Sequence, residues 1–255
     1  MLFRGQPAIM NQLSIYLPYL DRERDAGMAF MVTGPSGMGK TRLCFQCCNY
    51  LEPKGRYQYE LPGNGTIKLN TSVRVNFIDE IHLLKEPEIL YPYLDRNDRI
   101  IFLATNDSGE LPEALINRCT PLIFAPYSNE DLIGIARGIY TYQVDETFME
   151  KIVRAGFNNP RQIVYLSSRL VMYTKLYGIP TDLDSVLYNT FGVKDGVDTT
   201  GQRYLDFLRH VGGKASLDTL SAGLHISKTM ILFQVEPPLL YQGKIQISSK
   251  GRILC

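Results

Sequence analysis

Residues Met28–Thr41 read MAFMVTGPSGMGKT, an apolar run of strand length followed at once by a glycine-rich loop. The loop, Gly34–Thr41, fits the pattern G-x-x-x-x-G-K-[ST], in which glycines let the backbone curl so that successive N–H groups point at phosphates. A helical pattern resumes at Arg42, and the partial positive charge of a helix N-terminus favours an anion there. The sequence therefore predicts a strand–loop–helix site for the phosphates of a nucleotide.

Two side chains of this loop have specific expected roles. Lys40 is expected to reach the β- and γ-phosphates of ATP, and the hydroxyl of Thr41 is expected to ligate Mg²⁺. A plain glycine-rich turn is the alternative, but four fixed residues at this spacing are rare by chance, and the strand-to-helix context makes them rarer. The remaining nucleotide contacts are expected from Gly34, Pro35, Ser36, Gly37, Met38, Gly39 and Arg42.

A second apolar strand, Val73–Asp79, ends in a pair of acids. Asp79 is expected to hold Mg²⁺, and Glu80 is expected to polarise the water that attacks the γ-phosphate. An acid pair after a strand is often only the cap of the next helix. Because the phosphate loop precedes it in the chain, the catalytic interpretation is favoured here.

The remaining pattern predicts an α/β fold with several domains. Further strands are expected at Arg99–Thr105 and Pro121–Ala125, and strands separated by helices indicate a parallel sheet. From Ser128 onward the pattern is helical. A Gly/Asp/Thr-rich linker, Gly192–Gly201, then precedes three helices and a β-ribbon, the order typical of a winged helix. We predict a nucleotide-binding domain at 1–127, a helical lid at 128–191 and a winged-helix domain at 192–255.

Composition and charge are those of an ordinary globular protein. The net charge is +1, and the longest clean apolar stretch, Ile100–Ala104, is far shorter than a membrane span. No secretory signal pattern is visible, so we expect a cytoplasmic protein without a membrane partner. The five cysteines are odd in number and lack zinc spacing, and we expect them to act as small apolar fillers.

The phosphate loop and the acid strand, with what surrounds them, resemble AAA+ ATPases. The resemblance implies that Asn106, after the next strand, is sensor 1 and touches the γ-phosphate or the attacking water. It implies that Arg118 is an arginine finger that completes a neighbouring subunit's site, and that Arg161, in Asn159-Pro-Arg-Gln, is sensor 2 on the lid. A finger acting in trans implies a homo-oligomer, commonly a hexameric ring.

The resemblance narrows to the RuvB family of Holliday-junction branch-migration motors and covers nearly the whole chain. Phe3-Arg-Gly-Gln6 is similar to that family's motif beside the adenine, and Gln6 is the residue expected to contact the nucleotide. The spaced motifs Tyr204-Leu, Gly212-Gly213, Leu217-x-x-Leu220, Glu236-Pro-x-Leu-x-x-x-Gly243 and Gly251-Arg252 are similar to its winged helix. The implied activity is ATP-driven DNA translocation or branch migration in DNA recombination and repair.

One departure from the RuvB pattern concerns a partner protein. RuvB has a β-hairpin between the acid strand and sensor 1 that docks onto RuvA, whereas Ile81–Asp98 leaves room here for one helix and a turn. A RuvA-type partner is therefore not expected.

The winged helix offers basic residues that could meet DNA phosphates: Lys228, Lys244, Lys250 and Arg252. Such contacts carry no sequence information, which suits a motor that moves along any DNA. The alternative is a solvated face on a domain that binds protein.

Two other functions remain open at this point. One is a helicase or clamp loader that uses ATP as a switch, which the missing hairpin and the Arg118-Cys119 context favour. The other is a protein-remodelling AAA+ ATPase that binds no DNA. Binding to DNA that falls steeply with salt would exclude the latter.

Overall fold

The computed structural model describes residues 3–107, 109–194, 196–248 and 251–255. The chain divides into two compact units, Met1–Asp131 and Leu132–Cys255, and each is described by itself.

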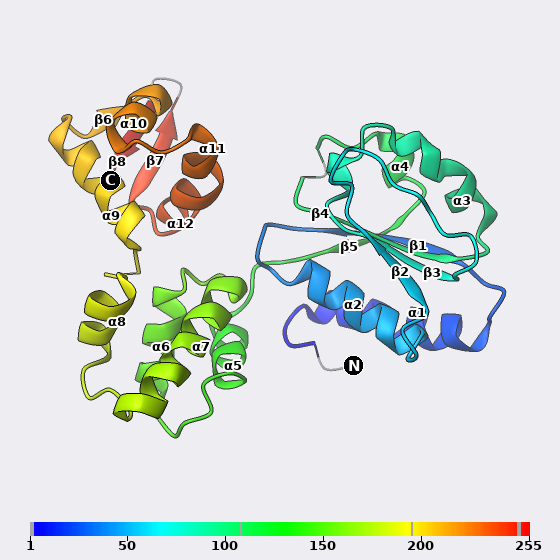
Figure 1. Ribbon diagram of the computed structural model, residues 1–255, viewed down its shortest axis with the longest axis horizontal. Helices are drawn as coiled ribbons and strands as arrows, with labels where there is room; N and C mark the ends of the chain where they lie inside the picture. Colours follow the sequence, from blue (N-terminus) through cyan, green and yellow to red (C-terminus); the bar gives the residue numbers. More distant parts are fainter. Residues whose placement is uncertain (1–2, 108, 195, 249–250) are drawn as a thin grey trace. The chain divides into compact units, whose positions relative to one another are not determined.

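The first unit is built on a five-stranded sheet in which every paired neighbour is parallel (Figure 1). The spatial order is β2-β3-β4-β1-β5, so the strand before the glycine-rich loop lies inside the sheet. Because all strands run the same way, the loops after β1, β3 and β4 share one edge. The strands are β1 (Met28–Thr33), β2 (Tyr57–Glu60), β3 (Val75–Ile78), β4 (Ile100–Thr105) and β5 (Thr120–Ile123).

Helices cover both faces of this sheet (Figure 1). On one face, α1 (Pro7–Arg22) and α2 (Lys40–Leu51) pack on a core that includes the stacked rings of Phe30 and Phe102, whose centroids are 5.0 Å apart. On the other face lie α3 (Tyr91–Arg96), α4 (Glu113–Ile116) and the short 3₁₀ turns η1 (Ile81–Leu83) and η2 (Pro87–Leu90). Both faces of β1, β3 and β4 are buried, which explains their continuous apolar runs.

The cysteines of α2 pack in the core, as expected from the sequence. Cys44, Cys47 and Cys48 are buried free thiols, and burial raises the pKa of each. They are small apolar residues between α2 and the sheet.

Two segments of the first unit refine the sequence-based expectations. The edge strand β2 was not expected; it pairs in parallel with β3, Tyr57 opposite Val75. The connection from Glu80 to β4, all of which the structure describes, contains only η1, η2 and α3 and no strand. This agrees with the expected absence of a hairpin between these elements.

The second unit begins with capped helices. Helices α6 (Glu146–Ala155), α7 (Pro160–Tyr177) and α8 (Leu183–Phe191) follow Asp145, Asn159 and Asp182, and each of these side chains accepts a hydrogen bond from a backbone N–H of the first turn. Helix α5 (Asn129–Arg137), across the division, begins after Ser128.

The rest of the second unit is three helical segments and a small antiparallel sheet of order β6-β8-β7. A buried cluster including Tyr204, Leu208 and Leu220 forms its core. Its elements are α9 (Thr199–His210), β6 (Lys214–Ala215), α10 (Leu217–Leu224), α11 (Lys228–Met230), η3 (Ile231–Val235), α12 (Glu236–Tyr241), β7 (Ile245–Ser248) and β8 (Gly251–Leu254).

The third helical segment is made of three short pieces of different helical type. Helix α11 passes through a π-helical turn, η3, into α12, and the run ends at Tyr241. Pro237 and Pro238 lie in the first turn of α12, directly after this π-helical turn.

No helix in the described part of the chain is long and apolar enough to cross a membrane.

Candidate functional site

The glycine-rich loop joins β1 to α2 in a backbone conformation that only glycine adopts easily. Gly39, the residue before α2, has φ +100°, and Gly34 has φ +149°. A Cβ on Gly34 would lie 2.6 Å from Cβ of Phe124. The two glycines are therefore required by backbone conformation and by close packing.

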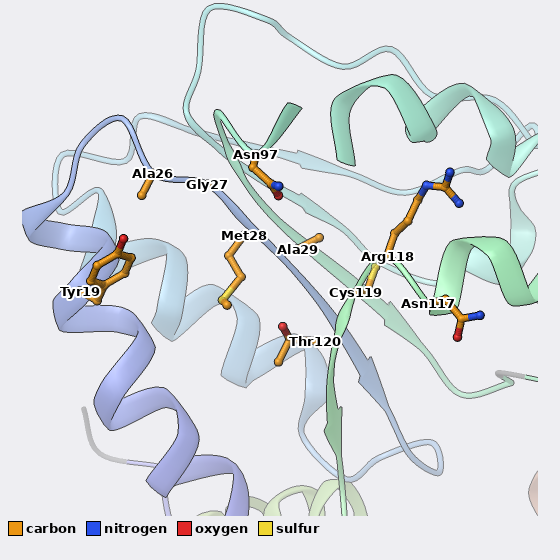
Figure 2. A pocket seen from close by; sticks show the side chains of 10 residues that line it. All are labelled: Tyr19, Ala26, Gly27, Met28, Ala29, Asn97, Asn117, Arg118, Cys119 and Thr120. Carbon is orange, nitrogen blue, oxygen red and sulfur yellow. The ribbon is translucent and has the colours of Figure 1, made fainter. Parts of the chain in front are cut away.

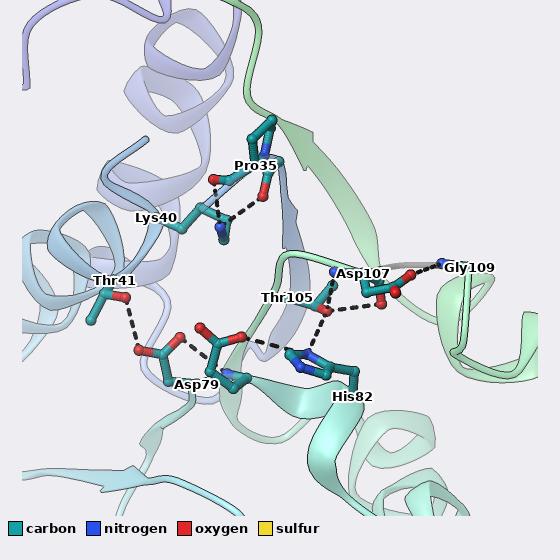
Figure 3. A network of polar contacts seen from close by, with 10 residues as sticks. Pro35, Lys40, Thr41, Asp79, His82, Thr105, Asp107 and Gly109 are labelled. Carbon is teal, nitrogen blue, oxygen red and sulfur yellow. Dashed lines mark hydrogen bonds and ion pairs between the residues drawn. The ribbon is translucent and has the colours of Figure 1, made fainter. Parts of the chain in front are cut away.

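Lys40 folds back across the loop that it ends. Its side chain is largely buried, and its Nζ donates hydrogen bonds to the carbonyl oxygens of Gly34, at 2.7 Å, and Pro35, at 2.9 Å (Figure 3). The ammonium charge is thus held at the mouth of the loop, on the carboxyl end of β1.

The structure brings Thr41 and Asp79 together although they lie on different elements (Figure 3). The Oγ1 of Thr41, in the first turn of α2, donates to Oδ2 of Asp79 at 2.8 Å. The other carboxylate oxygen of Asp79 accepts from the backbone N–H of Glu80 at 3.1 Å. Asp79 follows β3 directly, so its position depends on the pairing of β3 with β4.

These residues fit a magnesium–nucleotide complex. A threonine hydroxyl and a carboxylate side by side are the hard oxygen ligands that Mg²⁺ prefers, usually alongside water and substrate phosphates. A buried lysine and the backbone N–H groups of a helix N-terminus lie on the same edge of the sheet. Of the other loop residues, Pro35, Ser36 and Arg42 are exposed, and Met38 is buried against the core.

Glu80 stands beside Asp79 in an unusual backbone conformation. Its φ and ψ are 49° and 50°, the left-handed region that few non-glycine residues adopt. Residues held in this way cluster at functional sites, because the surrounding structure must stabilise them. The negative charges of Asp79 and Glu80 also affect Tyr59 on β2: partial burial, and then these two charges, raise its pKa.

The end of β4 places Thr105 and Asn106 next to the acids. Thr105 is buried and faces His82, whose Nδ1 lies 3.0 Å from its Oγ1. Asn106, the expected sensor residue, is exposed immediately after the strand. The structure therefore places Asn106 on the same edge of the sheet as the phosphate loop, since β4 pairs with β1 through Thr105 opposite Thr33.

Gln6 connects the N-terminal segment to the residues after β5. Its amide is buried and pairs twice with the backbone of Ala125: Nε2 donates to the carbonyl at 2.7 Å, and Oε1 accepts from the N–H at 2.8 Å. Because both amide atoms bond to the backbone of Ala125, Gln6 holds the N-terminal segment against the residues after β5.

Tyr127 is a site residue that the sequence analysis missed. Its hydroxyl donates to the carbonyl of Met38 inside the phosphate loop at 2.8 Å, and burial raises its pKa to about 12. Phe3 also lies against the loop, where a Cβ on Gly39 would meet its ring at 3.1 Å. No local pattern marks Tyr127, because its contact with Met38 spans a large separation in sequence.

Arg118 lies at the opposite end of the sheet. It precedes β5, whose Thr120 pairs with Phe30 of β1, so it sits by the amino end of β1. Its Nε donates to Oδ1 of Asp95 at 2.8 Å, its Nη1 donates to the carbonyl of Ala114 at 2.8 Å, and its guanidinium lies 4.6 Å from the ring centre of Tyr91. Since β1 has six residues, the two ends are about 20 Å apart at 3.3 Å per residue.

A shallow pocket adjoins Arg118 at this end (Figure 2). Residues of α1, β1 and the start of β5 line it, among them Tyr19 and Thr120, together with Asn97 at the end of α3. In this first unit Arg118 is therefore too far from the phosphate loop of its own chain to contact a ligand there.

The remaining expected residues lie in the second unit. Arg161 is exposed in the first turn of α7, next to the capping Asn159. Lys228 forms an ion pair with Asp218, Lys244 is half-buried, and Lys250 lies outside the described residues.

Arg252 requires a correction. It was expected on a DNA-facing wing, but its side chain is only 13% exposed and is bonded to the buried carboxylate of Glu236, Nε to Oε1 at 2.7 Å. The same Oε1 accepts from the hydroxyl of Tyr204 at 2.8 Å. Arg252 thus joins β8 to α9 and α12, and we leave it out of any DNA-binding surface.

Comparisons with known proteins agree with this architecture. The family model of the RuvB C-terminal winged helix domain matches residues 194–255. The solved structure of the Thermotoga maritima RuvB Holliday junction branch migration motor matches with a TM-score of 0.79 and 25% identity, over 99% of this chain and 93% of that one. A variant of the same protein matches with a TM-score of 0.80 and 24% identity over the same shares.

A more distant match concerns the fold alone. Domain III of the Thermotoga maritima replication initiation protein DnaA has a TM-score of 0.58 and 18% identity, over 75% of this chain and 95% of that one. From end to end, then, the chain has the AAA+ fold of RuvB, and its residues 194–255 match the RuvB C-terminal winged helix domain.

Proposed function

We propose that this protein is an ATPase that hydrolyses ATP to ADP and phosphate with Mg²⁺ bound at Thr41 and Asp79. The observation that carries the proposal is the 2.8 Å contact between these two side chains beside the buried Lys40. A loop of this pattern, a lysine and a metal-binding acid on one edge of a parallel sheet are the parts that phosphoryl transfer requires.

Each residue has a distinct role in the proposed reaction. Lys40 compensates the negative charge of the β- and γ-phosphates, and Glu80 orients a water for in-line attack on the γ-phosphorus. The bond to the β-phosphate oxygen breaks, and ADP leaves with that oxygen. Asn106 is proposed to hydrogen-bond to the γ-phosphate or the water. Bound Mg²⁺ would neutralise charge on the phosphate oxygens.

The proposal includes an oligomer in which a neighbour's Arg118 completes each site. Arg118 is held about 20 Å of strand away from the loop of its own chain. If Arg118 neutralises charge on a transferred phosphoryl group, it must therefore do so in the site of another subunit. A closed ring, commonly a hexamer in AAA+ proteins, satisfies this need for every site at once. Arg161 is proposed to act from the lid, 128–191.

We further propose that the ring moves on DNA, in the manner of RuvB. The RuvB-type winged helix at 194–255 supports this part, as does the likeness of the whole chain to the RuvB motor. Lys228 and Lys244 are the candidate phosphate contacts that remain among the described residues. Because residues 81–99 contain no strand, the proposal includes no RuvA-type partner.

An ATP-driven loader of another ring on DNA is the second candidate, and the absence of a strand in residues 81–99 favours it. Turnover separates the two. A motor should displace strands or move junctions by itself, whereas a loader should act only with its client ring. A protein-remodelling ATPase would show no salt-sensitive DNA binding.

Mixing two inactive variants tests the shared site. Arg118→Ala should lower the ATPase rate of the assembled protein by about 10³-fold or more, as the loss of such an arginine does elsewhere. Lys40→Ala should lose ATP binding. In a random 1:1 mixture about one interface in four combines an intact loop with an intact arginine, so activity should return to roughly a quarter of the wild-type rate.

The control is Arg22→Ala, which removes an exposed arginine of α1 and should leave the ATPase rate unchanged. No recovery on mixing would show that each site is contained in one chain.

A further inference from the structure

His82 lies between the catalytic acid and the end of β4 (Figure 3). Its Nδ1 is 3.0 Å from Oγ1 of Thr105 and 3.5 Å from Oε2 of Glu80. That Glu80 oxygen is buried and accepts no hydrogen bond among the described residues. The rest of the Glu80 side chain is partly open, with 34% of the side chain exposed. The imidazole therefore lies against the buried oxygen of the carboxylate.

The hydroxyl of Thr105 donates to the carbonyl oxygen of Asp107 at 2.9 Å and accepts from the N–H of Asp107 at 3.0 Å. A hydroxyl has one hydrogen, so in this arrangement the contact with His82 uses the tautomer that carries its hydrogen on Nδ1, and Nδ1–H donates to the oxygen of Thr105. This one hydrogen faces two acceptors, Thr105 and Glu80.

The backbone of Glu80 gives this contact its importance. The left-handed conformation of Glu80, directly before η1, turns the chain into that helix and sets the direction of the Glu80 side chain. A carboxylate that orients water must also be held in rotation, since small misplacements of reacting groups lower rates strongly. The contact of His82 Nδ1 with Glu80 Oε2, at 3.5 Å, can restrain this rotation.

We propose that His82 is a positioning residue for Glu80 and couples it to the loop that carries Asn106. The proposal rests on the proposed ATPase function. When residues 105–107 shift, the Nδ1–H is redistributed between Thr105 and Glu80, and the orientation of the carboxylate follows. The state of the β4 loop is thus transmitted to the acid through one imidazole.

Two substitutions of His82 test this role. His82→Leu keeps the bulk and removes the donor, whereas His82→Asn places an N–H donor where Nδ1 lies. We expect Leu to lower kcat by about 10- to 100-fold while the Kd for ATP stays within about threefold. Asn should retain kcat within about threefold of the wild type. His210→Ala, an exposed histidine at the end of α9, is the matched control and should change neither value.

A double-mutant cycle with Thr105→Val tests the coupling. The valine removes the acceptor at similar volume, and its effect on kcat should be non-additive with that of His82→Leu, because both changes break one link. Thermal unfolding shows that each variant is folded.

Four outcomes would overturn the proposal. Equal loss in the Leu and Asn variants, or loss of ATP binding at unchanged kcat, would assign His82 a packing role. Wild-type kcat in His82→Leu, while Glu80→Gln is inactive, would overturn the proposal and leave the proposed function intact. A wild-type protein that does not hydrolyse ATP would remove both.

Discussion

Asp79 in the first unit and Glu236 in the second are both buried acids that accept hydrogen bonds, and they differ in the charge of the groups that donate to them. Asp79 follows β3 and accepts from the Thr41 hydroxyl and a backbone N–H. Glu236 begins α12 and accepts from the Tyr204 hydroxyl and from two nitrogens of Arg252. Both side chains are almost completely buried, at 6% and 1% exposure.

The difference lies in charge compensation. Arg252 neutralises Glu236 within the domain, so that cluster is complete. Asp79 accepts from a hydroxyl and a backbone N–H, which are neutral donors. A carboxylate held by neutral donors keeps its negative charge and is suited to bind a cation. The comparison therefore separates an acid that stabilises the fold from an acid that, under the proposed function, serves a reaction.

The largest expected effect is on the ATPase rate, from a substitution of Glu80. Glu80→Gln removes the charge that polarises water, and we expect the ATPase rate to fall by about 10²- to 10⁴-fold while ATP binding is retained. The free energy of unfolding should change by no more than about 0.5 kcal/mol, because glutamine keeps the shape of the side chain and an acceptor oxygen for the 3.5 Å contact with His82. A steady-state ATPase assay with a fluorescent nucleotide titration checks both. Near wild-type turnover would show that Glu80 does not position the water.

The second effect is on stability, from a substitution in the cluster of Glu236, Arg252 and Tyr204. Glu236→Gln leaves the largely buried Arg252 without its counter-charge, and we expect the winged helix to lose about 3 kcal/mol of stability. Urea unfolding measures this loss. The matched control is Asp206→Asn, which breaks an exposed ion pair with Arg209 and should cost less than about 1 kcal/mol. Similar losses in both variants would remove the distinction drawn here.

The smallest effect is on stability, from a substitution of Tyr127 beside the phosphate loop. Tyr127→Phe removes the bond to Met38 and should cost about 1 kcal/mol at neutral pH. Burial, with a smaller contribution from the charge of Asp131, raises the pKa of Tyr127 to about 12. The folded chain therefore keeps the phenolic proton to higher pH than the unfolded chain.

The sign of the pH dependence follows. The stability contributed by this shift is complete below the ordinary tyrosine pKa of about 10 and is lost as pH rises toward about 12. Urea unfolding at about pH 8 and about pH 11 should show a smaller decline in Tyr127→Phe than in the wild type. Tyr50→Phe, an exposed residue of α2, should decline like the wild type. An equal decline in all three proteins would contradict the assignment.

Most of the fold could be predicted because its signals are local. The strand before Gly34 is an uninterrupted apolar run, and helices α6, α7 and α8 follow capping side chains that stand next to them in sequence. Strand β2 could not be predicted in this way. Its four residues, Tyr57–Glu60, alternate aromatic and polar side chains, which is a strand pattern too short to decide by itself. Pairing with β3 determines its conformation.

The residues of the candidate site also divide into those with a local sequence signal and those placed by contacts between distant parts of the chain. Lys40, Thr41, Asp79 and Glu80 follow from two short motifs whose spacing reflects chemistry. The contacts of Tyr127 with the loop, and of His82 with Thr105, join residues that no motif links. Arg252 shows the opposite error, since a basic residue on a wing resembles a DNA contact until its buried partner is known.

The position of Arg118 has a consequence for how such a protein responds to dilution. Under the proposed mechanism a lone chain binds nucleotide but lacks the cation that speeds its breakdown. Below the concentration at which chains associate, the rate per chain would then rise with protein concentration, and bystander hydrolysis by unassembled chains would stay low. The position of Arg118 would by itself restrict ATP hydrolysis to the assembled form, without a separate inhibitor.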